Sequence, residues 1–328
     1  MQNIYTDLAM EVAEGLGDEH LAGIEMDTVQ QGNVKVTTIH VVDEQGEKIL
    51  GKPMGSYITI ESPSIKENDF LAHEEIMGIL VRQLALLRDG LGIDEDAAVL
   101  VIGLGNKDVT PDALGPQVVS KVLVTRHIME ALPDELSSGL RPIAALAPGV
   151  MGMTGIETAE VVKGLVNNVR PQLVIAIDAL AARSINRINQ TIQMTDTGIS
   201  PGAGVGNRRA ALDKETLGVP VIAIGVPTVV DAATFVNDAL DIFLAQMAEE
   251  TPQHLRDGAE FFRMLNQLEE RDKHAVIRNS LEPSAGNMFV TPKEIGEVVK
   301  WLAGIIANGI NIAMHKSIDM DDINRFMY

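Results

Sequence analysis

The chain has 328 residues, of which 46% are hydrophobic and 3% aromatic, so it can fill the core of one large globular domain or two modest ones. Its 46 acidic residues outnumber 26 basic ones and give a formal net charge of −20, which argues against direct binding to nucleic acid or to an anionic membrane. The lack of cysteine excludes disulfides, thiolate metal sites and a cysteine nucleophile, and without a signal-peptide pattern or an apolar run of about 18 residues we expect a cytoplasmic protein.

The first part of the chain is predicted to be rich in β-structure. β-branched residues alternate over 34–42 and again over 57–60, on either side of a cluster of glycine and proline. This pattern predicts an antiparallel hairpin portion over about residues 34–62. Apolar residues at helical spacing over 70–87 then predict a helix that leads into the next strand.

From residue 97 onward, strands and helices are predicted to alternate. Predicted strands lie at 99–104, 143–146, 173–177, 187–194 and 221–226, and predicted helices run from 118 to about 132, over 154–166 with Thr154 and Glu157 as a capping box, and over 231–247. Strands that are apolar throughout are typical of a sheet covered on both faces. The pattern predicts an α/β fold with a mostly parallel sheet flanked by helices over 97–250. A helical C-terminal part follows over 251–328, with helices near 253–272, 292–308 and 319.

The glycine turn after the first buried strand is similar to the start of a dinucleotide-binding fingerprint. Gly103 and Gly105 occupy the first two glycine positions, but Asp108 replaces the third, where its negative charge would face a pyrophosphate. The sequence also lacks a Walker lysine motif, a helix with two zinc-binding histidines and a Gly-x-Ser-x-Gly elbow. We therefore expect no nucleotide, no resident metal and no other cofactor.

Carboxylates at predicted strand ends are the strongest candidates for catalysis. Asp112 follows the first buried strand, and Asp178 comes directly after the apolar run 173–177. Because parallel strands place their carboxyl ends at the same edge of a sheet, we expect these two side chains to meet there. A desolvated pair of carboxyls can divide hydrolysis between an acid and a base that activates water. The alternative is that each aspartate caps a helix, its commonest role in such a loop.

Further candidates follow Asp178 in the sequence. Asp196 opens an Asp-Thr-Gly triplet and is a candidate third acid, although the pepsin-like proteases that share this triplet are all-β proteins. The exposed backbone amides of a glycine-rich loop can bind a peptide carbonyl, although such a loop can also be a plain turn. Arginine side chains nearby can bind an acidic residue of the substrate, or they can simply be solvated at the surface. The candidate substrate-binding residues are Gly202, Gly204, Gly206, Arg183, Arg208 and Arg209.

Several longer motifs are spread in order over nearly the whole chain. They are GIEMD from Gly23, LGKP from Leu50, GSYITIE from Gly55, TPDALGP from Thr110, APGVMG from Ala147, IDALAAR from Ile177, and TDTGI from Thr195 continuing into PGAGVGN. On these motifs the chain resembles the germination proteases of endospore-forming bacteria. These are self-processing endopeptidases that start the breakdown of small acid-soluble spore proteins.

This resemblance implies a fold related to the peptidases that mature hydrogenases, a homotetramer, and a cytoplasmic location in the developing spore and the spore core. It implies that Asp112 and Asp178 are the catalytic acids and that the enzyme cuts after an acidic and before a large apolar residue. Asp7 and Leu8 form such a site, which implies a short pro-segment over 1–7 and a single peptidase domain over 8–328. The alternatives are a metal-assisted peptidase with the same carboxylates, and a non-catalytic α/β module that binds proteins.

Overall fold

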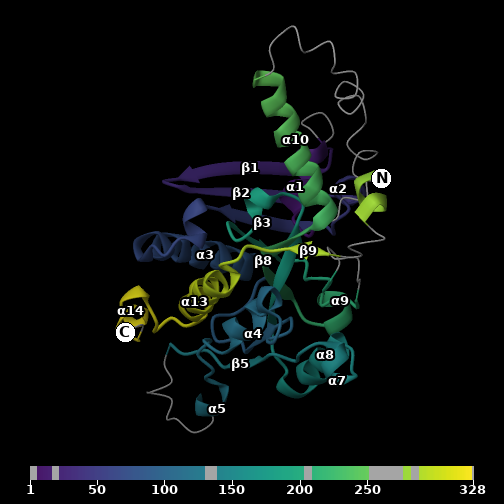
Figure 1. The fold of residues 1–328 in the computed structure, drawn as a ribbon. Coiled ribbons are helices and arrows are strands. Elements are labelled where there is room, and N and C mark those ends of the chain that lie inside the picture. The colour runs from purple at the N-terminus through teal and green to yellow at the C-terminus, as the bar shows by residue number, and fades with distance from the viewer. Residues whose placement is uncertain are drawn as a thin grey trace.

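One mixed β-sheet organises the part of the chain that the structure describes (Figure 1). The computed structural model describes residues 6–16, 22–129, 139–202, 209–250, 276–281 and 288–326. Strands from these residues follow the order β1-β2-β3-β7-β8-β6-β4-β5, and β9 pairs with β8. Their bounds are β1 Ile24–Gln31, β2 Val34–Val41, β3 Gly55–Glu61, β4 Val99–Gly103, β5 Ile143–Leu146, β6 Leu173–Ala182, β7 Thr191–Thr195, β8 Val221–Asp231 and β9 Phe289–Val290.

The sheet has a parallel half and an antiparallel half. The neighbours β8, β6, β4 and β5 all run parallel to one another. β1, β2, β3 and β7 pair antiparallel, and β7 joins the two halves by pairing antiparallel with β8. The predicted α/β class, with a parallel core and an antiparallel portion near the N-terminus, is confirmed. The antiparallel portion is larger than predicted because β1 and β7 extend it.

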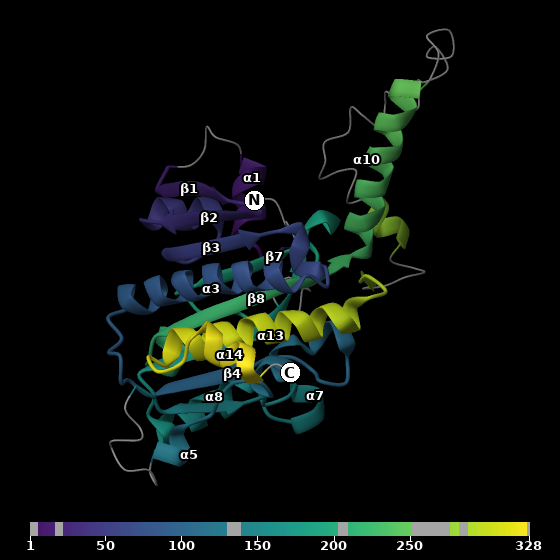
Figure 2. The same ribbon diagram turned by 90° about the vertical axis from the view of Figure 1, so that its left-hand side faces the viewer.

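Helices cover both faces of the parallel half. α3, α4 and α13 bury apolar side chains on one face, and Figure 2 shows α3 and α13 side by side across the strands. α8 and α9 pack on the other face. Successive residues of β4, such as Val101 and Ile102, therefore enter different cores, and the strand must be apolar throughout.

The helices are α1 Ala9–Leu16, α2 Glu44–Leu50, α3 Phe70–Gly90, α4 Leu114–Val119, α5 Arg126–Met129, α7 Met151–Thr154, α8 Thr158–Val169, α9 Lys214–Leu217, α10 Ala232–Glu250, α13 Ile295–Met314 and α14 Met320–Phe326, with 3₁₀ turns η2 Pro63–Lys66, η3 Thr110–Asp112 and η4 Ile185–Arg187.

α13 is the one helix of the described residues that is long and apolar enough to cross a membrane by length and composition. However, 61% of its most apolar 18-residue window is buried inside the molecule, where it packs against α3 and α4. Its composition is therefore that of a core helix.

The N-terminal region differs from the predicted hairpin in two ways. β1 was not predicted, because its apolar residues Ile24, Met26 and Val29 do not alternate strictly with polar ones. Almost all of its side chains are exposed along an edge strand, so burial imposes no regular pattern. α2 interrupts the hairpin between β2 and β3. Its start is set by Asp43, whose side chain accepts hydrogen bonds from the N–H groups of Gln45 and Gly46, and its end by Gly51, which has a φ of +67°.

Three predicted boundaries after β4 are wrong. The long helix from 118 is two short ones, α4 and α5, because Leu123 between them donates its N–H to Asn311 Oδ1 of α13 instead of continuing the helix. The predicted capping box does not form, since Glu157 begins α8 without a side-chain cap. β6 does not end at Asp178 but continues to Ala182.

Some of the other elements predicted after β4 are confirmed, one is partly wrong, and one cannot be compared. The strand over 143–146, the helix after β8 and the last two helices are confirmed as β5, α10, α13 and α14. Of the predicted strand over 187–194, the first residues form the turn η4 and only the rest belong to β7. The predicted helix over 253–272 lies outside the described residues.

Candidate functional site

The candidate site lies where β4 ends and β6 continues. β4 stops at Gly103, which is level with Ile177 of β6, so Asp178 is the first residue of β6 beyond its pairing with β4. The chain leaves β4 through Gly105 and returns in η3, whose last residue is Asp112. Asp112 and Asp178 line the same cavity, so the predicted meeting of these side chains at one sheet edge is what the structure shows.

The turn after β4 holds the Asp112 carboxylate in place. Gly105 has a φ of +107°, and a Cβ atom there would lie 2.1 Å from the backbone oxygen of Asp112. Asn106 donates its backbone N–H to Asp112 Oδ2 at 2.7 Å. α4 begins after Ala113 without a side-chain cap, so Asp112 does not have the helix-capping role that was its alternative.

Burial raises the pKa values of both carboxyls. The pKa of Asp178, which is only 6% exposed, is raised well above its ordinary value by burial and further by the charges of Asp112 and Asp7. Burial also raises the pKa of Asp112, against the opposing effects of the Asn106 N–H and the charge of Arg209. The pair can therefore hold one proton at a pH where ordinary carboxyls are ionised, as acid and base catalysis by two carboxyls requires.

The cavity that these carboxyls line has a volume of about 420 Å³. Arg209 lies on its wall and forms an ion pair with Glu157 at 3.8 Å. The other lining residues include Asp7, Val109, Val150, Leu180, Gly202, Thr228, Val229, Phe289 and Thr291.

The N-terminal segment enters this cavity beside β6. Asp7 donates its N–H to the oxygen of Ala181 at 3.1 Å and accepts the Ala181 N–H on Oδ2 at 2.9 Å. The side chain of Leu8 is fully buried against Leu180 and Ala182. The predicted acidic and apolar pair therefore lies at the edge of the site, with the acidic side chain held by backbone and the apolar one in a pocket.

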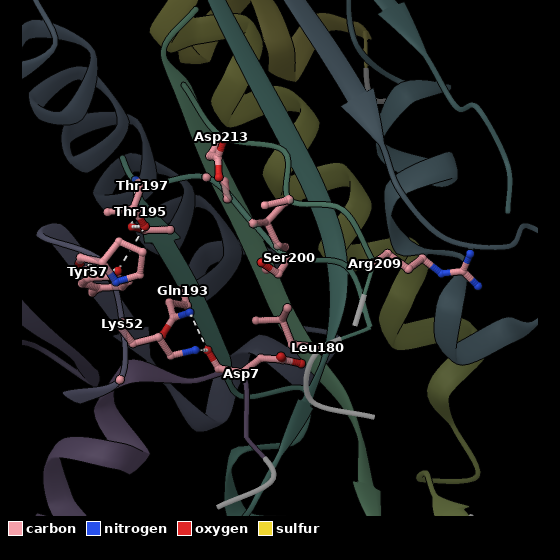
Figure 3. A pocket seen from close by; sticks show the side chains of 17 residues that line it. Asp7, Lys52, Tyr57, Leu180, Gln193, Thr195, Thr197, Ser200, Arg209 and Asp213 are labelled. Carbon is pink, nitrogen blue, oxygen red and sulfur yellow. Dashed lines mark hydrogen bonds between the residues drawn. The ribbon is translucent and has the colours of Figure 1, made fainter. Parts of the chain in front are cut away.

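A second cavity, of about 290 Å³, adjoins the first through Asp7, Leu180 and Arg209 (Figure 3). The oxygen of the Asp7 carbonyl accepts hydrogen bonds there from Lys52 Nζ at 3.0 Å and from Gln193 Nε2 at 3.2 Å. Neither residue was predicted from the sequence to belong to the site. The available signals were weak: Lys52 stands in the LGKP motif, and Gln193 is a polar residue at a buried strand position.

The remaining candidate residues are placed differently. Asp196 accepts the Ser56 N–H on Oδ1 at 2.8 Å and does not line the cavity of Asp112 and Asp178. Arg183 lines a separate pocket, where its N–H donates to Glu11 Oε2 at 2.8 Å. Gly202 and Arg209 line the cavity, whereas Gly204, Gly206 and Arg208 lie outside the described residues.

The described ranges contain no group of three or more histidine, aspartate or glutamate side chains that could hold a metal ion. The expected lack of a metal stays a prediction.

Comparison with known proteins places the chain among the peptidases. The family model described as germination protease matches residues 4–258 and 246–327. The germination protease of Clostridium tetani is 45% identical over 328 residues, which cover 99% of both chains. Those of Clostridium perfringens and Bacillus subtilis are 44% and 40% identical, over 100% and 97% of this chain and 100% and 95% of their own. The chain belongs to the germination protease family, as its motifs predicted.

Proposed function

We propose that the protein is an endopeptidase that initiates the degradation of small acid-soluble spore proteins during germination, cutting after an acidic and before a large apolar residue. One observation carries this proposal beyond family membership. Asp7, an acidic residue followed by the large apolar Leu8, lines the cavity in which Asp112 and Asp178 have raised pKa values, and Leu8 is buried beside it against Leu180. The site therefore has the chemistry for hydrolysis and already holds a sequence of the expected specificity.

The two aspartates divide the proton transfers of peptide hydrolysis. The ionised carboxyl removes a proton from the attacking water, and the protonated carboxyl gives its proton to the departing amide nitrogen. Asp178 is the group more suited to hold the proton first, because it is the more buried of the two and its pKa is raised the more strongly. Asp196 is engaged with Ser56, and we assign it no proton transfer.

The placement of Asp7 and Leu8 favours synthesis as a zymogen that cuts its own bond between these residues. In the uncut chain, Asp7 and Leu8 occupy the place of a substrate and keep other chains out of the site. Gly202 and Arg209 are the cavity-lining candidates for contact with longer substrates. We further propose a homotetramer in the cytoplasm of the developing spore and in the spore core, with no direct partner among nucleic acids or membranes.

The direct test incubates the purified full-length protein with a small acid-soluble spore protein and reads the cut positions by mass spectrometry. Asp112→Asn and Asp178→Asn should each abolish cutting of the precursor and of the substrate. Asp108→Asn is the matched control, because Asp108 is an exposed residue of the same turn. Full activity of either site variant would contradict the carboxyl pair.

Two further results of this experiment decide between the alternatives. A metal-assisted peptidase predicts that a chelator stops turnover and that a divalent ion restores it, whereas the carboxyl pair alone predicts no effect. A non-catalytic module predicts that the spore protein binds tightly and is recovered uncut.

A further inference from the structure

Two side-chain donors point at one backbone oxygen in the second cavity (Figure 3). Lys52 Nζ and Gln193 Nε2 lie 3.0 Å and 3.2 Å from the carbonyl oxygen of Asp7. This carbonyl belongs to the bond between Asp7 and Leu8. Two convergent donors on the carbonyl of a bond to be hydrolysed are the geometry of an oxyanion hole.

Gln193 holds the chain on both sides of that bond. Its Nε2 donates to the Asp7 oxygen, and its Oε1 accepts the N–H of Ala9 at 2.7 Å. A single amide group therefore fixes the backbone before and after the bond between Asp7 and Leu8. Gln193 thereby orients the carbonyl through contacts to the backbone of the cleaved chain alone. Such contacts do not depend on which side chains the substrate carries.

Both donors are supported by regular structure. Gln193 lies in β7 between two strands, level with Thr59 of β3 and Gly225 of β8, and is only 8% exposed. Lys52 directly follows Gly51, which ends α2, and the next residue, Pro53, is held by a hydrogen bond from the Tyr57 hydroxyl to its carbonyl at 2.8 Å. The site is therefore preorganised and needs little reorganisation during the reaction.

We propose that Lys52 and Gln193 form the oxyanion hole of this peptidase. The inference rests on the proposed function, because it takes the bond between Asp7 and Leu8 as the one that is cut. Charge supports it independently. An oxyanion would form on Asp7, a residue that also lines the cavity of Asp112 and Asp178, at least one of which is ionised in the reaction. The ammonium group of Lys52 supplies a positive charge that offsets this repulsion.

The proposal assigns each proton and electron pair in the hydrolysis. Water adds its oxygen to the Asp7 carbonyl carbon and gives a proton to the ionised carboxyl, while the C=O electron pair moves to the oxygen held by Lys52 and Gln193. The tetrahedral intermediate then re-forms C=O and breaks the C–N bond, and the Leu8 nitrogen takes the proton of the other carboxyl. The products are a carboxyl group on Asp7 and an α-amino group on Leu8. The carboxyl proton is then needed at the leaving nitrogen and not at the carbonyl oxygen.

The test follows self-cleavage of the full chain after cell-free synthesis, with mass spectrometry of the product that begins at Leu8. This reaction involves no second molecule, so its first-order rate constant contains no substrate-binding step. Lys52→Met and Gln193→Met should each slow it about 10² to 10³-fold. Lys48→Met is the matched control, because it removes an exposed lysine of the preceding helix and should leave the rate unchanged. Thermal unfolding of each purified variant identifies any that fails to fold. Lys52→Arg retains a donor and the charge, so it should be cut faster than a folded Lys52→Met. If Lys52→Met does not fold, Lys52→Arg takes its place and should be cut at a rate between that of the unmodified chain and that of Gln193→Met.

Gln193→Glu separates an oxyanion hole from a purely structural role. A glutamate keeps the oxygen that accepts the Ala9 N–H, but it can donate to the Asp7 oxygen only when it is protonated. The rate of this variant relative to the unmodified protein should therefore rise as the pH falls. For Gln193→Met the ratio should not change with pH. A flat ratio for Gln193→Glu would contradict the proposal.

The outcomes distinguish this proposal from the one on which it rests. If the unmodified chain is never cut between Asp7 and Leu8, the proposed self-processing and the oxyanion hole are both wrong. If it is cut there, and Lys52→Met and Gln193→Met are cut within about tenfold of its rate, only the oxyanion hole is wrong.

Discussion

Replacing Gly105 with alanine tests whether the turn after β4 sets the position of Asp112. Gly105 has a φ of +107°, and a Cβ atom there would lie 2.1 Å from the backbone oxygen of Asp112 and 3.0 Å from its Oδ1. Cβ atoms essentially never approach other atoms within 3.0 Å, so the Asp112 backbone would have to retreat. The required movement is about 1 Å, which is large on the scale of catalytic geometry.

The expected effects follow from the positive φ and from the contact with the Asp112 backbone. An alanine held at this positive φ costs about 1–3 kcal/mol of folding free energy. A displacement of about 1 Å at a reacting group reduces rates about 10²-fold. Gly105→Ala should therefore lower the free energy of unfolding by about 1–3 kcal/mol or more and slow self-cleavage about 100-fold.

Gly92→Ala is the control for backbone strain alone. Gly92 also has a positive φ, +66°, but a Cβ atom there would have no neighbour within 4 Å. Urea unfolding and the first-order rate of self-cleavage are measured for both variants. Gly92→Ala should lose stability and retain activity. If Gly105→Ala is cut within about threefold of the rate of Gly92→Ala, the turn does not position Asp112.

Three further predictions concern the carboxyls and the N-terminal segment. The folded-state pKa of Asp178 is raised, so the contribution of its carboxyl to stability is fully present below the ordinary pKa of 3.8 and is lost as the pH rises through the folded-state pKa. Asp178→Asn should therefore be more stable than the unmodified chain at neutral pH but not at pH 3, as measured by urea unfolding. Asp112→Asn should lower the pKa of Asp178, because the Asp112 charge raises it, and NMR titration of the Asp178 carboxyl would show this directly. Leu8→Ala removes a fully buried side chain from its contacts with Leu180 and Ala182, so it should weaken the binding of residues 7 and 8 to β6 by about 2–3 kcal/mol. Self-cleavage should then be slower, and an added nonspecific protease should cut the chain near residue 8 faster.

The parallel core was predictable because its strands are buried on both faces. β4 and β5 follow the predicted ranges closely, since a strand that sends alternate side chains into two cores must be apolar throughout. β1 gave no such signal, because an edge strand with solvent on both faces can be polar. The break between α4 and α5 also could not be predicted, since it depends on Asn311, which is 188 residues from Leu123 along the chain.

The candidate site was predictable only in its carboxyls. Asp112 and Asp178 each follow an apolar run, so their position along the chain indicated their position at the sheet edge. Lys52 and Gln193 lie 45 and 186 residues from Asp7 in the sequence, and no local pattern connects them with it. Their convergence on one carbonyl follows from how β7, α2 and the N-terminal segment are packed, which only the structure shows.

The extension of β6 beyond β4 bears on the conformation that we expect of a substrate. β4 stops level with Ile177, while β6 continues along β8 to Ala182, so the last residues of β6 have an open side. There Asp7 donates its backbone N–H to the Ala181 oxygen, and its side-chain carboxylate accepts the Ala181 N–H. A chain that binds in the same way must offer backbone N–H and C=O groups that are not already paired, because Asp7 and Ala9 use theirs for these contacts. If substrates bind as Asp7 and Leu8 do, we expect stably folded proteins, whose backbone groups are already paired internally, to be spared and unstructured chains to be cut.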